Sequence, residues 1–254
     1  MKNGAVVFLA LGLFFFCDAR EEASNELSFR FEEACNTPSD ISEHVPLLYQ
    51  LSKEVSSVVE IGMRGMVSSW GILQGLSESP FSHRSYIGID ISSPPYDTLN
   101  AAQLLARAHG IEFTFLQAND MDIDIPETDF LFIDSLHTYC HLTYELEKFS
   151  PSIRKYIAMH DTSPPWESVD DSEYHGDFSE YPDYIDKNKR GLWLAVEDFL
   201  QRHPEWKLAA RYINCHGFTI LERKNDEQSM VLVDFCHVLR ATTGRERKDS
   251  YIPF

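Results

Sequence analysis

The sequence predicts an α/β protein with a doubly wound, mostly parallel sheet and a C-terminal antiparallel hairpin. Short apolar runs alternate with segments of helical spacing between residues 56 and 161. Strands that alternate with helices of about 10–15 residues are typical of βαβ units and a parallel sheet. A chain of 254 residues is also long enough for one domain with a substantial core.

The expected elements follow one another along the chain. Residues 20–55 are expected to form helical segments broken near Pro38 and Pro46, with Asp40 as a helix N-cap. Strands are expected over 56–62, 85–91, 111–120, 129–134 and 155–161. Helices are expected over 65–78, 96–110, 138–153 and 191–206, and a hairpin over 207–224.

The N-terminus has the pattern of a secretory signal peptide. Lys2 precedes an uncharged apolar run over 5–16, and the small residue Ala19 follows it. The run is too short for a comfortable membrane span, so no stable span is expected after cleavage. Residues 1–19 are therefore set apart from a domain over 20–224 and a C-terminal tail over 225–254.

Charge and cysteine content limit the partners and the compartment. The formal net charge of −18 argues against nucleic acid, because phosphate binding needs clustered Lys and Arg. The five cysteines include no CxxC pair and no framework spacing, which favours free thiols. Cysteine usage is thus typical of an intracellular protein, whereas the leader indicates the secretory pathway or export. Both localisations stay open.

One long loop interrupts the alternation. Residues 162–186 are rich in acidic and aromatic side chains and contain no Lys or Arg. Loops of this length inside a compact domain are often lids or binding loops. The segment is a candidate lid over a binding site, with Trp166 as its packed residue, and the alternative is a flexible solvated loop.

Side chains that bind a nucleoside are expected at the first three strand ends, because ligands of parallel sheets bind at the carboxyl edge. Gly62 and Gly65 follow the first strand and leave room for a ligand near the backbone, although GxxG is an incomplete dinucleotide fingerprint. Asp90 ends the second strand, where a carboxylate can accept hydrogen bonds from a ribose. Asn119 and Asp120 end the third strand, where they could contact an adenine or cap the chain.

Asp/His pairs end the next two strands. Asp134 and His137 follow the fourth strand, and His160 and Asp161 follow the fifth. Carboxylates and imidazoles at adjacent strand ends can orient a hydroxyl, take its proton or bind a divalent cation. His141 lies one helical turn beyond His137 and is expected to point away from this site.

The ordered motifs VVEIGMRGMVSS, GIDI, FIDSLHTY, YIAMHDT and GLWLAVEDFLQRHPEW…NCHGFTILER resemble the class I S-adenosylmethionine (SAM)-dependent methyltransferases, with their Rossmann-like fold. The resemblance covers about residues 45–224. It is greatest to the branch with Asp-x-x-His-x-Tyr and His-Asp motifs, near the cephalosporin-hydroxylase-like and the sugar or macrolide O-methyltransferase groups.

The resemblance implies roles for the strand-end residues. Glu60, Gly62 and Gly65 would shape the methionine pocket of SAM, Asp90 would hold the ribose, and Asn119 and Asp120 would lie by the adenine. His137 or His160 would be the base, and Asp134 would orient it. Asp134 and Asp161 would be the ligands of Mg²⁺ where a metal is used. The chain departs from the pattern at Ser135, where glycine is expected, and at IRKY before the fifth strand, where Gly-Gly is expected.

These observations predict a SAM-dependent methyltransferase that methylates a hydroxyl of a small molecule. Two alternatives remain. The Asp/His cluster would also suit a metal-dependent hydroxylase-like or hydrolase-like enzyme. The leader favours a non-catalytic member of the fold that binds a nucleoside or glycan, because SAM is chiefly an intracellular cofactor.

Overall fold

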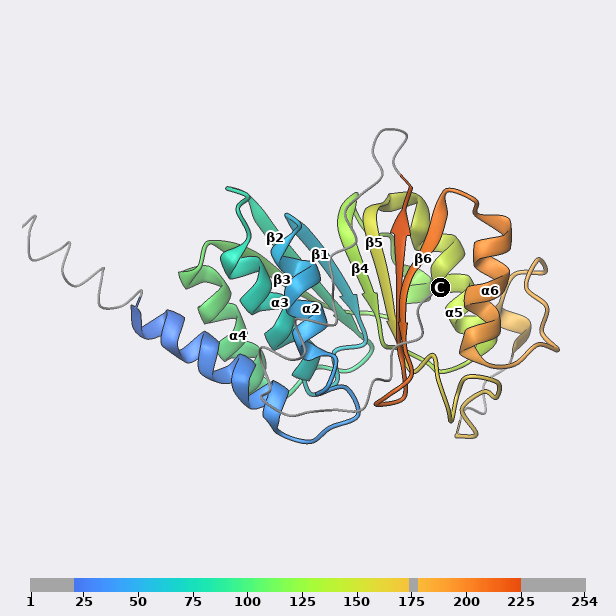
Figure 1. Ribbon diagram of the computed structural model, residues 1–254, viewed down its shortest axis with the longest axis horizontal. Helices are drawn as coiled ribbons and strands as arrows, with labels where there is room; N and C mark the ends of the chain where they lie inside the picture. Colours follow the sequence, from blue (N-terminus) through green and yellow to red (C-terminus); the bar gives the residue numbers. More distant parts are fainter. Residues whose placement is uncertain (1–20, 174–177, 225–254) are drawn as a thin grey trace, which may run out of the picture.

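A seven-stranded sheet forms the centre of the computed structural model, which describes residues 21–173 and 178–224. The strand order is β3-β2-β1-β4-β5-β7-β6 (Figure 1). Neighbouring strands from β3 to β5 are parallel, whereas β7 is antiparallel to both β5 and β6. The strands are β1 (Ser57–Ile61), β2 (Arg84–Asp90), β3 (Ile111–Gln117), β4 (Thr128–Ile133), β5 (Ile153–His160), β6 (Trp206–Tyr212) and β7 (Phe218–Arg223). The Rossmann-like sheet with its C-terminal hairpin is therefore confirmed.

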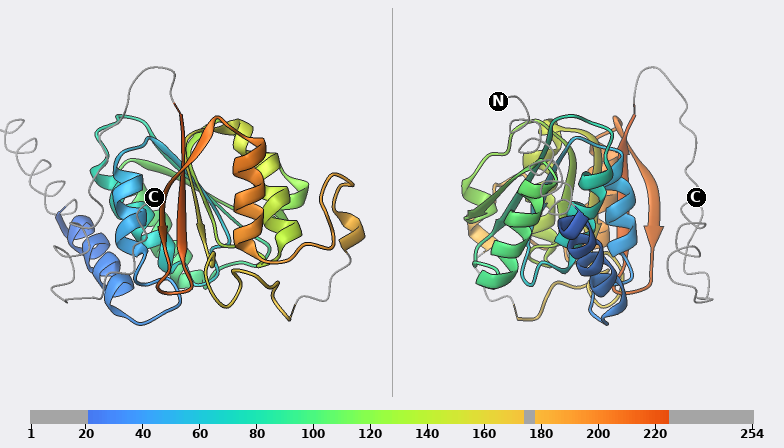
Figure 2. Two further views of the ribbon diagram at one scale, coloured as in Figure 1. Left: turned by 45° about the vertical axis from the view of Figure 1, so that its right-hand side comes forward. Right: turned by 90° about the vertical axis from the view of Figure 1, so that its left-hand side faces the viewer.

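Helices cover both faces of the sheet (Figures 1 and 2). One face packs against α2 (Val45–Lys53), α3 (Val67–Glu78), α4 (Tyr96–Ala108) and a helix whose described part spans 21–36. The other face packs against α5 (Tyr139–Phe149) and α6 (Leu192–Arg202). No helix in these described ranges is long and apolar enough to cross a membrane. The predicted leader (1–19) and tail (225–254) lie outside the described residues.

The alternation of side chains along each strand divides the core into two layers. Phe130 and Phe132 of β4 pack under α2, α3 and α4, whereas Leu131 and Ile133 pack under α5 and α6. All four side chains are at most 3% exposed. A parallel strand covered on both faces needs a continuous apolar run, and that is the pattern from which the strand was predicted.

Two local predictions were wrong. Asp40 caps no helix, since α2 begins after His44 with Pro46 in its first turn. Proline suits that position because its missing N–H would have no partner there. The third strand ends at Gln117, before the predicted 120, and Asp120–Asp122 form the short 3₁₀ helix η1. Asn119 caps η1 by accepting a hydrogen bond from Met121 N (3.0 Å).

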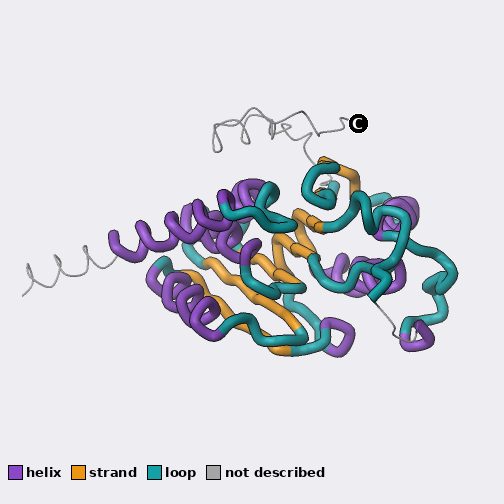
Figure 3. The backbone as a smooth tube through the Cα atoms, turned by 90° about the horizontal axis from the view of Figure 1, so that it is seen from below, coloured by secondary structure: helices purple, strands orange, loops and turns teal. Residues whose placement is uncertain are grey.

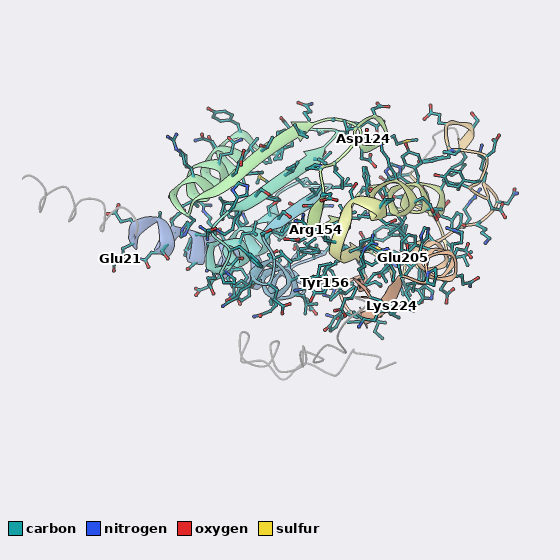
Figure 4. All side chains as sticks on the ribbon, turned by 90° about the horizontal axis from the view of Figure 1, so that it is seen from above. Glu21, Asp124, Arg154, Tyr156, Glu205 and Lys224 are labelled. Atoms are coloured by element: carbon teal, nitrogen blue, oxygen red, sulfur yellow. The ribbon has the colours of Figure 1, made fainter. Side chains whose placement is uncertain are left out.

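The two edges of the sheet differ in character. The loops that follow the parallel strands gather at the carboxyl edge, on the side seen in Figure 3. At the opposite edge, polar pairs hold strand ends together (Figure 4): Arg154 Nε donates to Asp129 (2.8 Å), and Lys224 N donates to Glu205 O (2.7 Å). The strand-end residues singled out above, from Asp90 to Asp161, all belong to the carboxyl edge.

Candidate active site

A cavity of about 490 Å³ lies at the carboxyl edge, at the ends of β1, β2, β3 and β4. Its wall includes Gly62, Asp90, Asn119 and Asp120, four of the predicted cofactor residues, together with Asp134. Small-molecule sites commonly have about 300–1,000 Å³. We call this space the large cavity, and its size suits a nucleoside-containing ligand.

Gly62 and Asp90 together shape the loop after β1. Gly62 has φ +87°, and a Cβ there would lie 2.0 Å from the carbonyl oxygen of Asp134, so that only glycine fits. Asp90 Oδ2 accepts hydrogen bonds from the backbone N–H groups of Met63 and Arg64, each 2.8 Å long. Asp90 therefore holds the loop as well as lining the large cavity. A Cβ at Gly65 would meet no atom within 4 Å, so sterics do not require glycine there.

Glu60 lies outside the cofactor position predicted for it. Its side chain is fully buried, and the hydroxyls of Ser68 and Ser69 on α3 and of Tyr86 on β2 donate hydrogen bonds to the carboxyl group. Burial raises the pKa of Glu60 to about 7, even though these hydroxyls favour the charged form. It lines neither the large cavity nor the smaller cavity described below. Its contacts are those of a buried link between the sheet and α3.

His141 was expected to lie away from the Asp/His pairs at the ends of the fourth and fifth strands, but the sequence did not indicate that it lines the large cavity. Its Nε2 lies 3.1 Å from Asp120 Oδ2 and 3.8 Å from Glu145 Oε1. We call Asp120, His141 and Glu145 the inner cluster. Sequence reasoning also missed Ile91, which lines the cavity with its side chain 71% exposed. The available signal was an apolar residue directly after the strand-end acid Asp90.

A second cavity of about 150 Å³ adjoins the large one, and Gly62, Arg64, Asp134 and Ser135 line both. His137 and Asp161 line only this smaller space, which we call the acceptor cavity. Trp166, the residue singled out in the predicted lid, lies with its ring centroid 4.5 Å from that of His137. The acceptor cavity therefore places an Asp/His pair directly beside the large cavity.

Asp134, His137 and Asp161 form the outer cluster. His137 Nε2 lies 2.8 Å from Asp161 Oδ2 and 3.8 Å from Asp134 Oδ1. Burial opposes a charge on His137, but the two carboxylates outweigh it and raise its pKa to about 9. Burial likewise opposes ionisation of Asp134, but His160 and His137 outweigh it and hold the pKa of Asp134 well below its usual range. The cluster is therefore charged at neutral pH.

His160 does not reach the acceptor cavity, and its side chain is 1% exposed. Its Nε2 lies 2.9 Å from the carbonyl oxygen of Cys215, and because a carbonyl only accepts, Nε2 carries a proton. Its Nδ1 lies 3.4 Å from Asp134 and 3.2 Å from Asp161. The geometry thus makes His160 a group that positions both carboxylates, and it leaves His137 as the imidazole facing the cavity.

His216 is a further imidazole at this site that sequence reasoning did not single out. Its Nδ1 lies 3.3 Å from Asp161 Oδ1. It sits in the β6–β7 turn, where Cys215 and His216 both have left-handed φ angles (49° and 64°), as does Asp161 (60°). Non-glycine residues in that region cost about 1–3 kcal/mol each and concentrate at functional sites. Its only sequence signal was a histidine before the turn glycine Gly217.

The outer cluster has the donor set of a divalent-cation site. One ligand atom from each of its three residues lies within 4.8 Å of the others. Asp161 Oδ1 and His137 Nδ1 are buried and accept or donate no hydrogen bond among the described residues. Buried polar atoms normally have a partner, so these residues fit a bound cation.

Comparison with known proteins finds similarity only among solved structures. No family model and no curated protein matches the chain. An O-methyltransferase of Bacillus cereus in complex with SAH is 15% identical, with 80% of this chain and 91% of that chain covered and a TM-score of 0.46. A protein of Corynebacterium glutamicum is 16% identical (89% and 100% covered, TM-score 0.49). The O-methyltransferase TomG of Streptomyces achromogenes, involved in tomaymycin synthesis and in complex with SAM, is 15% identical (80% and 90% covered, TM-score 0.43).

Proposed function

We propose that this protein is a SAM-dependent methyltransferase that methylates a hydroxyl group of a small molecule. The observation that carries the proposal is the pair of adjoining cavities, which share Gly62, Arg64, Asp134 and Ser135. One is large enough for a nucleoside cofactor, and the other presents His137 beside Asp161. A transfer reaction needs such an arrangement, in which two ligands meet at one wall.

The large cavity would hold SAM. The loop at Gly62 would face its methionine part. Asp90 would accept from a ribose hydroxyl at Oδ1, which accepts only from Ser92 N among the described residues, whereas Oδ2 already accepts from two backbone N–H groups. Asn119 and Asp120 line the same cavity and would lie by the adenine. Gly65 lines the acceptor cavity, so any contact it makes would be near the transferred methyl group.

The chemistry required of the protein is modest. SAM supplies an electrophilic methyl group, so the acceptor oxygen forms a bond to that carbon while the carbon–sulfur bond breaks. Holding two reactants in line can supply roughly 7–11 kcal/mol in favourable cases. The neutral form of His137, whose share grows as pH rises toward its pKa of about 9, would take the proton of the acceptor hydroxyl, and Asp161 and Asp134 would stabilise the imidazolium that forms.

A divalent cation would fit the same cluster. Asp134 and Asp161 would hold Mg²⁺, with carboxylate oxygens of the kind that this ion prefers. Bound there, it would lower the pKa of the acceptor hydroxyl. The donor set also favours a second candidate, a metal-dependent hydroxylase-like or hydrolase-like enzyme, which would use the outer cluster without methyl transfer.

Calorimetric titration of the purified chain with SAM and with SAH, with and without Mg²⁺, tests the proposal. Binding of both is expected, together with loss of affinity in Asp90→Ala and methyl transfer to members of a hydroxylated acceptor panel. If the intact protein binds neither, the proposal is wrong. Binding without turnover on any acceptor would favour a non-catalytic nucleoside-binding protein. Mg²⁺-dependent binding that is lost in Asp134→Asn, in a protein that methylates no acceptor, would favour the hydroxylase-like or hydrolase-like alternative.

A further inference from the structure

The inner cluster contains two residues, His141 and Glu145, to which the proposed methyl transfer gives no role. Asp120, His141 and Glu145 are 8%, 6% and 0% exposed, so all three lie more than nine-tenths buried. Asp120 and His141 line the large cavity, and Glu145 lies behind them. Burying two carboxylates and an imidazole away from solvent costs free energy unless each charge has a partner.

Local structure brings the three side chains together. Thr138 caps α5 by accepting a hydrogen bond from His141 N, and Glu145 follows His141 by four residues on the same helix face. Lys148, also on α5, donates to the carbonyl oxygens of Asp120 and Met121 (2.9 and 2.8 Å). Helix η1 is thereby tied to α5, with the Asp120 carboxylate beside His141.

Two hydroxyls orient the donors. The ring of His141 has Nδ1 3.0 Å from the hydroxyl of Tyr181, which leaves Nε2 facing the two carboxylates. Ser135 donates to Glu145 Oε1 (2.7 Å), and Ser135 is the residue found where the resemblance predicts glycine. Metal-binding histidines and carboxylates typically have such outer partners, which fix the ring and the carboxylate in place.

The carboxylate oxygens of this cluster are incompletely paired. Glu145 Oε2 is buried and makes no hydrogen bond with any described residue, whereas Asp120 Oδ2 lies 3.1 Å from His141 Nε2. Leaving a buried acceptor unsatisfied costs about 1–3 kcal/mol. The arrangement therefore leaves Glu145 Oε2 as a buried acceptor that a cationic ligand would satisfy.

We propose that Asp120, His141 and Glu145 bind a divalent transition-metal ion of the Zn²⁺ class. Ligands about 2.0–2.1 Å from a tetrahedral ion lie about 3.3 Å apart. The distances from His141 Nε2, 3.1 Å to Asp120 and 3.8 Å to Glu145, bracket that value. The imidazole nitrogen favours zinc over magnesium, which prefers oxygen alone. The ion would join η1 to α5 and so fix one wall of the large cavity.

Zinc binding by the full chain tests the site without SAM or an acceptor, so its outcome is independent of the proposed function. The chelator-stripped protein is titrated with Zn²⁺ against a chromophoric chelator. One tight Zn²⁺ is expected, retained in Asp161→Asn, which breaks the outer cluster, and lost in Glu145→Gln. Tyr181→Phe keeps the ring and removes the hydroxyl that orients His141. It should weaken binding by roughly 10–100-fold.

His203→Asn is the matched control. His203 contacts Glu147 and Glu205 at 2.9 and 3.0 Å, but these side chains are 20–42% exposed. Tight Zn²⁺ binding should be unchanged in this variant. The proposal is overturned if the folded intact chain binds no tight Zn²⁺, or if Tyr181→Phe binds it as tightly as the intact chain. The second result decides the matter even if Glu145→Gln does not fold.

Discussion

The outer and inner clusters contain the same kinds of side chain in different surroundings. The outer cluster has Asp134, His137 and Asp161, and its first two residues are about one-fifth exposed at a cavity. The inner cluster has Asp120, His141 and Glu145, all of them buried. A reacting group must meet its substrate, so the outer cluster suits catalysis. The inner cluster suits a permanently bound ligand.

The balance of charge differs as well. In the outer cluster, His160 and His216 add two imidazoles, so that three histidines lie beside two carboxylates. In the inner cluster a single imidazole faces two carboxylates, and burial raises the pKa of Glu145 to about 8. The carboxylates of the outer cluster thus have imidazole partners within the chain. In the inner cluster Glu145 keeps its proton at neutral pH in the ligand-free protein, and a cation bound there would displace that proton.

The largest expected effect is that of His137→Gln on methyl transfer. Loss of a general base typically lowers kcat by roughly 10²–10⁴-fold. The affinity for SAM should be unchanged, because His137 lines the acceptor cavity and not the large cavity. Steady-state kinetics and calorimetry measure the two quantities. His83→Gln, at an exposed histidine before β2, is the control. Normal turnover in His137→Gln would mean that His137 is not the base of the reaction.

Glu60 is a third buried carboxyl site, and it differs from both clusters because hydroxyls rather than imidazoles surround it. Its pKa is raised from 4.5 to about 7, so the folded protein holds this proton across a pH range in which the unfolded chain has lost it. The free energy of unfolding should therefore fall by about 3 kcal/mol as pH rises through that range.

Urea unfolding at pH 5 and pH 8 measures this change. Glu60→Gln keeps the shape of the side chain and removes the titration, so the variant should lose about 2.5 kcal/mol less than the parent between the two pH values. Other titrating groups cancel in the difference between the two proteins. An equal loss in both would mean that Glu60 is already ionised in the folded protein.

The sequence predicted a feature correctly where that feature depends on a single strand or helix. Continuous apolar runs identified β4 and β5 because strands buried on both faces require them, and the acids at their ends could be read directly. That His141 lines the large cavity beside Asp120 could not be predicted, because it depends on how η1 packs against α5. Similarly, His216 owes its position to left-handed residues in a hairpin turn, a conformation that its side-chain type does not signal.

Gly62 and Gly65, in the loop after β1, test how closely this loop packs against the outer cluster. Gly62 packs against Asp134 of that cluster. Gly62→Ala places a Cβ against the Asp134 carbonyl at a positive φ and should destabilise the fold by about 2–3 kcal/mol. Gly65→Ala meets no atom within 4 Å and should change stability by less than about 0.5 kcal/mol. Thermal or urea unfolding distinguishes the two. Equal effects would mean that the close approach of Gly62 to Asp134 is not maintained in solution.

The smallest expected effect concerns Asp171, whose Oδ2 lies 3.9 Å from His137 Nδ1 and is partly exposed. Because the pKa of His137 is raised to about 9, the fraction able to act as base should grow with pH up to that value. Removing a nearby negative charge destabilises the imidazolium. Asp171→Asn should therefore shift the rising limb of kcat/KM to lower pH by roughly 0.2–0.7 pH unit.

The pH–rate profile is measured without added divalent cation, so that His137 titrates as the ligand-free structure describes it. Asp183→Asn, at a fully exposed acid of the same loop, is the matched control and should leave the limb in place. A shift to higher pH in Asp171→Asn would contradict the assignment of the limb to His137. A limb that moves with neither variant, yet disappears in His137→Gln, would assign the titration to His137 while showing that solvent screens Asp171 completely.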